Sequence, residues 1–361
     1  MKKYLKIIVT ILILIAIGFG LYYFFKKSPV AQDFLGGIFP GTFKTGEKTG
    51  VQPIAGEKLQ ALTQDPIFDY WINSKTGNIY YLTPVGQIIR VSGGQEELVN
   101  SQTLNRLNQL TASPDGTSAT AKFSYPDFPT FSIFDTVANA WHPLPAGTLA
   151  AAWSPTASEI AYLDNKALKI LNLVNQKTAE VLKLTQKEAE LYWRPDSKIL
   201  LTNGLLSSEL ESQIWSINPA NKTITPLLSE VGLAVKWSLD GKFGIRLKSV
   251  NRAPLLGLID ENGQTLAELT FVTLPSKCLI REKKIYCAVP KNLPERVNLP
   301  EDYYKKAVYF EDNFYLIDLN TGGVSTIFSP DSPIDAEHLE LDGDRLLFKN
   351  RLDEKLYQLT L

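Results

Sequence analysis

The sequence is poor in the side chains that bind metal ions. Its 361 residues include only two cysteines and two histidines. A zinc site needs about four such ligands close together, and His142 and His338 lie far apart along the chain. Motifs for nucleophilic, phosphate-binding or metalloprotease chemistry are missing too, including Gly-x-Ser-x-Gly, Gly-x-x-x-x-Gly-Lys, His-Glu-x-x-His and Cys-x-x-Cys. We therefore expect no metal, no cofactor and no catalytic residue, and we do not predict an enzyme.

A basic surface is missing as well. The formal net charge is −1, but residues 1–27 hold five lysines and no acid, so the remainder carries −6. Nucleic-acid binding depends on neutralising phosphates with clustered Lys and Arg. The mildly acidic remainder therefore argues against a nucleic-acid partner.

One long apolar run is present, at residues 7–25. As a helix it would span about 28 Å, close to the thickness of a bilayer core. Lysines flank it, and aromatic residues at 22–25 suit the membrane interface. A cleaved signal peptide is the alternative, but its apolar region would be about 7–15 residues long and would end at a small-x-small site. We predict an uncleaved signal anchor at 7–25.

The segments on either side of this anchor complete the topology. Residues 1–6 would be cytoplasmic, with a slight lysine bias in favour of that orientation. Residues 26–56 are rich in Gly and Pro, which weaken helices and strands, and they predict a flexible stalk. The chain is thus expected to be a single-pass protein of the cell membrane, with residues 57–361 outside the cytoplasm.

A repeat fills residues 57–361. Each copy has four short apolar strands, and the first two are joined by a tight turn such as Ser113-Pro114-Asp115-Gly116. The strand residues before each turn are spaced by 40, 41, 40, 44, 43 and 59 positions. Seven such anchors define the repeat: Ile72, Ala112, Trp153, Trp193, Trp237, Ile280 and Leu339. A period of about 40–45 residues with four strands is typical of a β-propeller.

The ends of the chain predict how the ring closes. Residues after Leu339 suffice for three strands, and residues 57–63 have no blade of their own. We predict that residues 57–63 supply the outer strand of the last blade, which removes an exposed edge. The fold class is therefore all-β, a seven-bladed propeller of four-stranded antiparallel blades, preceded by one transmembrane helix.

The Ser-Pro-Asp-Gly turn at 113–116, with a degenerate copy at 238–241, resembles the TolB-like and WD-repeat-like propellers of bacterial envelope proteins. The resemblance covers about residues 57–361 and implies the fold, with almost nothing about activity. The loop at 287–294 is also similar to a segment of an uncharacterised family of membrane-anchored propellers from uncultured bacteria. That second likeness implies family membership and no chemistry.

The two cysteines predict a disulfide. If Glu282 and Lys283 form a two-residue hairpin loop, Cys278 and Cys287 oppose each other at a non-hydrogen-bonded pair, with Cα atoms about 4.5 Å apart. A disulfide can bridge that distance and would persist in an oxidising compartment. Two buried free cysteines are the alternative.

Candidate interaction residues lie in the second-to-third strand connections. These are the variable ones, at 124–130, 203–212, 248–254 and 290–306, and all share one face of the disc. Tyr125, Phe128, Tyr303 and Tyr304 would form an apolar patch there, unless they fold back over blade edges. Packing and turn capping explain the other recurring residues, namely Trp153, Trp193, Trp237, Asp115, Asp196 and Asp240.

Three functions remain open. A protein-interaction scaffold of the cell envelope is the leading one, and it predicts a broad loop face without converging acids of shifted pKa. A carbohydrate or small-ligand sensor predicts a deep axial pocket lined with aromatic and amide side chains. A hydrolase or lyase with an axial site predicts two carboxylates or an acidic–basic cluster with a strongly shifted pKa.

Overall fold

The computed structural model describes residues 58–186, 188–203 and 206–361. The predicted cytoplasmic segment 1–6, anchor 7–25 and stalk 26–56 lie outside these residues. No helix in the described part of the chain is long and apolar enough to cross a membrane.

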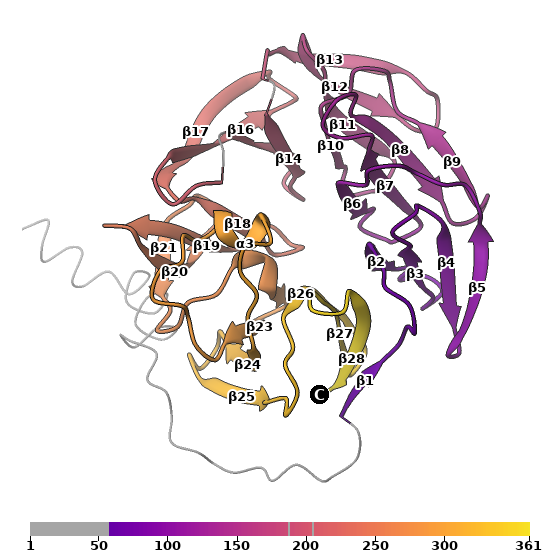
Figure 1. The fold of residues 1–361 in the computed structure, drawn as a ribbon. Coiled ribbons are helices and arrows are strands. Elements are labelled where there is room, and N and C mark those ends of the chain that lie inside the picture. Colours follow the sequence, from indigo (N-terminus) through magenta and orange to yellow (C-terminus); the bar gives the residue numbers. More distant parts are fainter. Residues whose placement is uncertain (1–57, 187, 204–205) are drawn as a thin grey trace, which may run out of the picture.

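The described chain forms seven four-stranded antiparallel sheets arranged in a ring, as Figure 1 shows. The predicted all-β, seven-bladed propeller of four-stranded antiparallel blades is confirmed. The first three blades, each from inner to outer strand, are β2 (Asp69–Ile72), β3 (Ile79–Leu82), β4 (Ile88–Ser92) and β5 (Gln95–Asn100); β6 (Gln109–Ala112), β7 (Ser118–Phe123), β8 (Thr130–Asp135) and β9 (Ala140–Pro143); and β10 (Ala150–Trp153), β11 (Glu159–Leu163), β12 (Ala167–Asn172) and β13 (Thr178–Lys183).

The remaining blades follow the same order. They are β14 (Ala189–Trp193), β15 (Ile199–Asn203), β16 (Glu211–Asn218) and β17 (Thr223–Val231); β18 (Ala234–Trp237), β19 (Phe243–Val250), β20 (Ala253–Asp260) and β21 (Thr265–Glu268); β22 (Cys278–Arg281), β23 (Lys284–Pro290), β24 (Asp312–Asp318) and β25 (Val324–Phe328); and β26 (Ala336–Asp342), β27 (Arg345–Asn350), β28 (Lys355–Thr360) and β1 (Leu59–Ala61). Short helices η1 (Pro275–Lys277) and α3 (Glu301–Tyr304) complete the list.

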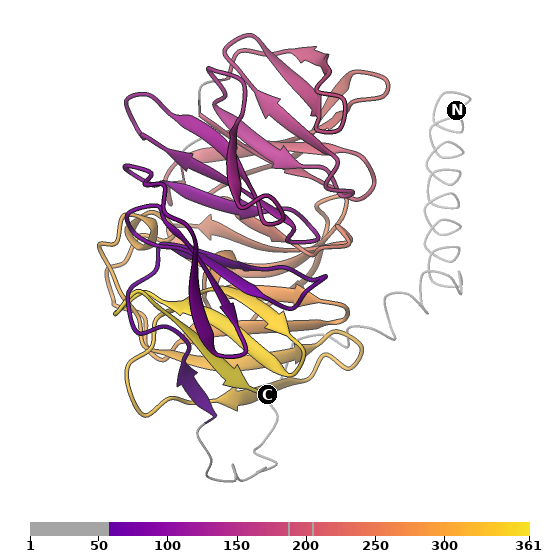
Figure 2. The same cartoon turned by 90° about the vertical axis from the view of Figure 1, so that its right-hand side faces the viewer.

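Ring closure takes place as the sequence predicts. The strand β1 pairs antiparallel with β28, with Leu59 opposite Leu359. The Leu62 amide also donates to the Leu356 carbonyl at 2.8 Å. The seventh blade is therefore built from both ends of the propeller sequence, which removes one free sheet edge (Figures 1 and 2).

The Ser-Pro-Asp-Gly turn owes its composition to contacts between blades. Gly116 has φ +66°, and a Cβ there would lie 1.8 Å from the Ile72 carbonyl oxygen, so only glycine fits. The Trp71 indole N–H donates to the Gly116 carbonyl at 3.2 Å, which joins the first blade to the second. Asp115 caps the turn by accepting hydrogen bonds from the Ser113 hydroxyl and the Thr117 amide.

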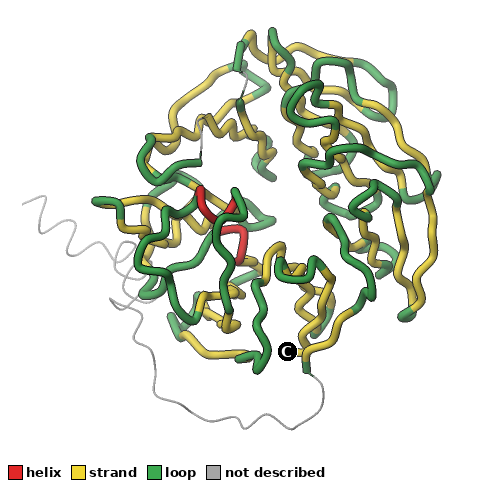
Figure 3. The backbone as a smooth tube through the Cα atoms, viewed as in Figure 1, coloured by secondary structure: helices red, strands yellow, loops and turns green. Residues whose placement is uncertain are grey.

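Apolar side chains pack mostly between neighbouring blades. One buried cluster joins Leu279 and Phe314 of the sixth blade to Leu346 and Phe348 of the seventh. The Trp153 indole N–H donates to the Thr111 carbonyl of the preceding blade at 3.1 Å. Figure 3 shows strands (yellow) joined by loops (green) around the ring, with few helical segments (red).

The predicted variable loop at 248–254 is wrong. The ladder of β19 and β20 continues to the Val250–Ala253 pair, which leaves only Asn251 and Arg252 in the turn. Both residues have positive φ, +51° and +67°, the conformation that a tight hairpin turn requires.

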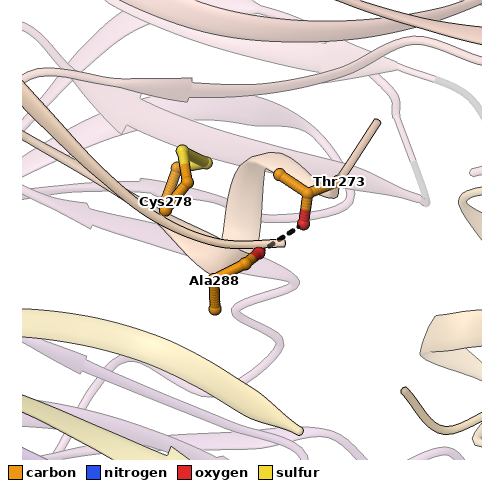
Figure 4. The surroundings of a disulfide bond; sticks show 4 residues. Thr273, Cys278 and Ala288 are labelled. Atoms are coloured by element: carbon orange, nitrogen blue, oxygen red, sulfur yellow. Dashed lines mark hydrogen bonds between the residues drawn. A yellow bond between two sulfur atoms is a disulfide. The ribbon is translucent and has the colours of Figure 1, made fainter. Parts of the chain in front are cut away.

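The predicted disulfide is confirmed. Cys278 and Cys287 are register partners in β22 and β23, with Cα atoms 4.1 Å apart and a bond between their sulfur atoms. Both cysteines are buried. Figure 4 shows the bond beside the Thr273 hydroxyl, which donates to the Ala288 carbonyl at 2.6 Å.

Candidate functional site: a charged axial cavity

The innermost strands of the blades surround a cavity of about 870 Å³, which we call the axial cavity. Its wall combines apolar side chains with polar or charged ones from the innermost strands, including Asp69, Gln109, Glu190, Lys236, His338 and Glu340. Pro84, Lys306 and Glu354, from second-to-third strand connections, also line it. The cavity therefore lies toward the face that carries the variable loops, the face that the sequence marked for binding.

A β-bulge brings His338 into the cavity. The register of β26 against β27 shifts between Glu337 and Glu340, and His338 has φ +51°. The Tyr70 hydroxyl donates to the His338 carbonyl at 2.7 Å, and the two rings lie 4.8 Å apart. Asp69 Oδ1 is hydrogen-bonded to Nδ1 of His338, which fixes the orientation of the imidazole. Backbone strain held in place by such contacts is common at functional sites.

The pKa values of His338 and Lys236 are shifted in opposite directions. Enclosure works against the charged imidazole, but the Asp69 and Glu340 carboxylates outweigh it and raise the pKa of His338. Enclosure lowers the pKa of Lys236, although Glu340 and Asp69 oppose this effect. The same side of the cavity thus holds a stabilised imidazolium and an ammonium that is poorly compensated.

Glu190 and Tyr304 form another part of the wall. Glu190 has water-accessible surface within the cavity, yet the surrounding protein restricts its hydration, and this desolvation raises the pKa of the carboxyl group. The Lys122 ammonium lowers that pKa only in part. Desolvation likewise raises the pKa of Tyr304 to about 12, and its hydroxyl donates to the Ser276 hydroxyl at 3.2 Å.

Most charged side chains of the axial cavity have partners. Lys306 pairs with Glu354 at 2.9 Å, Lys349 with Glu337 at 3.5 Å, and Arg106 with Asp127. Asp69 and Glu340 both lie against His338, Glu340 at 3.9 Å. Within the described part of the chain, Glu190 and Lys236 are the charged wall residues whose side chains form neither an ion pair nor a hydrogen bond.

A second group of charges, the buried ion cluster, lies between the sixth and seventh blades. It consists of Lys277, Asp312, Asp335 and Arg351, none more than 6% exposed. The Lys277 ammonium contacts Asp312 at 2.7 Å and also Asp335, and the Arg351 guanidinium contacts Asp335 at 2.7 Å. Burial raises the pKa of Asp312 to about 6 in spite of Lys277.

This cluster anchors the insertion at 291–311. The Arg351 guanidinium donates to the Tyr303 carbonyl at 2.9 Å and lies 3.7 Å from the centre of the Tyr303 ring. The Asp335 carboxylate accepts a hydrogen bond from the Phe310 amide at 3.0 Å. Tyr303 is 1% exposed, so its predicted place in an exposed patch is wrong, because the ring packs inward on the cluster.

The other predicted patch residues are exposed but lie in two different places. Phe128 is 80% exposed and Tyr125 is 43% exposed, both in the connection between β7 and β8. Tyr304 is also 43% exposed, but it faces the axial cavity. Trp153 and Trp193 are buried and Trp237 partly buried. Asp240 accepts the Ser238 hydroxyl and Asp196 the Lys198 amide, both within their turns.

The sequence interpretation missed the cavity residues. The aligned anchors could have found them, because positions one and three residues before an anchor point the same way along a strand. Those positions hold Asp69, Glu190, Lys236 and His338, which are charged or titratable residues in strands that otherwise pack apolar side chains. In the described residues no three His, Cys, Asp or Glu side chains are arranged to hold a metal ion.

Comparison with known proteins places the fold and leaves the activity open. No protein-family model matches the chain, and neither does any curated protein sequence. An oligogalacturonate lyase in complex with manganese is similar, with a TM-score of 0.60 at 10% identity, covering 84% of this chain and 93% of that one. A virginiamycin B lyase from Staphylococcus aureus gives 0.54 at 13% identity, covering 84% and 98%.

TolB from Acinetobacter baumannii is among the similar structures as well. It gives a TM-score of 0.40 at 15% identity, covering 81% of this chain and 78% of that one, a likeness too weak to carry detail. At these identities the similarities show a shared fold alone. The chain is thus a seven-bladed β-propeller, and it shares its fold with the two lyases.

Proposed function

We propose that this protein binds a small polar ligand in the axial cavity and that residues 7–25 anchor it in the cell membrane, with the propeller outside the cytoplasm. The observation that carries the proposal is the convergence of titratable side chains with shifted pKa values in one cavity. A scaffold that uses only its loop face would not require this convergence. The disulfide supports an oxidising compartment.

Thermal-shift screening of the full-length chain in mild detergent tests ligand binding. The screen would contain neutral sugars, sugar acids, amines, amino acids and nucleosides. A ligand that binds only the native state raises the unfolding temperature. At a hundred times its Kd it adds about 2.7 kcal/mol to the free energy of unfolding. We expect at least one class to stabilise the wild type and to lose its effect in Gln109→Trp, which fills the cavity from β6.

Gln95→Trp on the exposed outer strand β5 is the matched control and should keep the effect. The binding proposal fails if no class stabilises the wild type, or if Gln109→Trp and Gln95→Trp respond alike. Carbonate extraction of membranes tests the anchor separately: the full chain should stay in the pellet, and a chain starting at residue 27 should not.

Partner binding at the β7–β8 connection is a second candidate, favoured by the exposure of Phe128 and Tyr125. Photo-crosslinking from position 128 in native membranes, with position 137 on the opposite turn face as control, tests it. A discrete crosslinked species from 128 alone supports a scaffold role, and identical patterns from both positions oppose it.

A further inference from the structure

The two unpartnered charged residues of the axial cavity have opposite signs. Glu190 projects from β14 of the fourth blade and Lys236 from β18 of the fifth, the neighbouring blade in the ring. Both line the same cavity of about 870 Å³. The other charged wall residues are neutralised by protein partners, as described above. The cavity therefore presents one free carboxyl group and one free ammonium group to whatever enters it.

Leaving such groups unpartnered has a physical consequence. A partly desolvated charge without a hydrogen-bonded partner costs free energy, and this cost favours the neutral form of each group. Desolvation accordingly raises the pKa of Glu190 and lowers the pKa of Lys236, each toward the neutral form. A ligand that brings both missing counter-charges would reverse both costs at once.

We propose that the ligand is a small zwitterion, with its carboxylate bound by Lys236 and its ammonium group bound by Glu190. This inference rests on the proposed ligand-binding function and specifies the ligand class. Amino acids, ω-amino acids and short peptides with free termini have this chemistry. A cavity of this volume accommodates molecules of that size.

Ligands with a single kind of charge fit less well. An anion on Lys236 would leave Glu190 unpaired. A cation on Glu190 would leave Lys236 unpaired. Only a molecule with both charges pairs both groups at once.

Isothermal titration calorimetry of the full-length protein in detergent tests the proposal. The probes are glycine, γ-aminobutyrate, ε-aminohexanoate and glycylglycine, which vary the distance between the charges. Each probe has two matched analogues, one without the amine and one without the carboxylate. We expect one zwitterion to bind at least tenfold more tightly than both of its analogues.

Variants then assign the two ends. Lys236→Met and Glu190→Gln should each weaken that zwitterion at least tenfold, and each should bring its affinity down to that of the analogue lacking the corresponding charge. Lys177→Met and Glu268→Gln, at exposed positions of the third and fifth blades, should leave the affinity unchanged. The double reversal Glu190→Lys with Lys236→Glu should bind better than either single reversal, and urea unfolding would confirm that all variants fold.

Three outcomes overturn the inference. Analogues that bind as well as the zwitterion, or variants that do not discriminate between them, remove the ligand class but leave the cavity as a binding site. Failure of every zwitterion, combined with a stabilising sugar or nucleoside in the thermal-shift screen, has the same meaning. Failure of all compounds in both experiments removes the proposed function as well.

Discussion

The buried ion cluster and the axial cavity contain the same kinds of side chain in opposite states. In the cluster, Lys277 is fully buried and contacts two aspartates, and Arg351 completes the charge balance. In the cavity, Lys236 has no ion-pair or hydrogen-bond partner among the described residues, and neither has Glu190. Lys277 ends η1, directly before the innermost strand of the sixth blade, and Lys236 lies in β18, the innermost strand of the neighbouring fifth blade.

The difference shows how to separate structural from functional charges in this propeller. A buried charge with well-placed partners is costly to break, because each partner is left uncompensated. A charge that faces a water-filled cavity without a partner contributes little to folding and is available to a ligand. The cluster holds the insertion with α3 beside the cavity, whereas the cavity residues are free to bind.

The largest expected effect comes from removing the lysine of the cluster. Lys277→Met leaves Asp312 and Asp335 buried without their cation, and we expect a loss of about 3–5 kcal/mol in the free energy of unfolding. Lys236→Met, the matched change in the cavity, should alter stability by less than about 1 kcal/mol, because it removes a charge that has no partner. Urea unfolding of both variants measures the difference.

The comparison breaks if the two lysine variants are destabilised equally. In that case Lys236 would have a structural partner in the native protein, and the cavity would be part of the framework. Where Lys277→Met does not fold at all, Lys277→Arg provides a weaker test. It keeps the charge and should lose less stability than Lys277→Met.

A pH-dependent effect should come from Asp312. Burial raises its pKa from the ordinary value to about 6, so the folded state favours the protonated form. Its contribution to stability is therefore complete below about pH 4 and is lost as pH rises through about 6. At about 1.4 kcal/mol per pKa unit, the loss amounts to roughly 2–3 kcal/mol.

Urea midpoints of the wild type and Asp312→Asn between pH 4 and pH 7.5 test this expectation. The difference in stability between the two proteins should change across the window in favour of the asparagine variant at higher pH. Asp127→Asn, at an exposed position paired with Arg106, is the control and should show no such trend. A parallel pH dependence in all three proteins would show that Asp312 is fully compensated by Lys277.

The architecture was accessible from the sequence because its determinants are local and repeated. Turn chemistry at 113–116 and the spacing of the anchors reveal seven units, and the unpaired residues 57–63 reveal closure. The opposition of Cys278 and Cys287 follows from the length of a single hairpin loop. Each of these inferences needs only the regular geometry of strands and turns.

The cavity was not accessible in the same way. Glu190 and Lys236 lie in different blades, and their meeting depends on how all seven blades pack around the axis. Nor could the sequence show that Tyr303 turns inward, since its partner Arg351 is 48 residues away. His338 enters the cavity through a β-bulge, and no turn motif in the sequence predicts that bulge. Long-range packing decides these positions, and a single sequence does not record it.

A smaller effect is expected at Glu190. Restricted hydration raises its pKa, so the ionised form is disfavoured in the folded protein, and stability from this group is present at low pH and lost as pH rises. Glu190→Gln should therefore be neutral or slightly stabilising at neutral pH, by less than about 1 kcal/mol, because cavity water screens the charge. A clear loss of stability in urea unfolding would show that Glu190 has a structural role like that of Asp335.

The smallest effect concerns the orientation of His338. Asp69 and Glu340 raise its pKa, and Asp69→Asn should lower it, because a neutral amide oxygen replaces the charged carboxylate that pairs with Nδ1. With only two histidines in the chain, nitrogen-15 NMR titration of imidazole resonances can follow each one, and exposed His142 is the internal reference. The His338 resonances should move in Asp69→Asn, and those of His142 should not. Identical His338 titration in both proteins would mean that Asp69 does not control this imidazole, and the cavity would then hold a third group without a fixed partner.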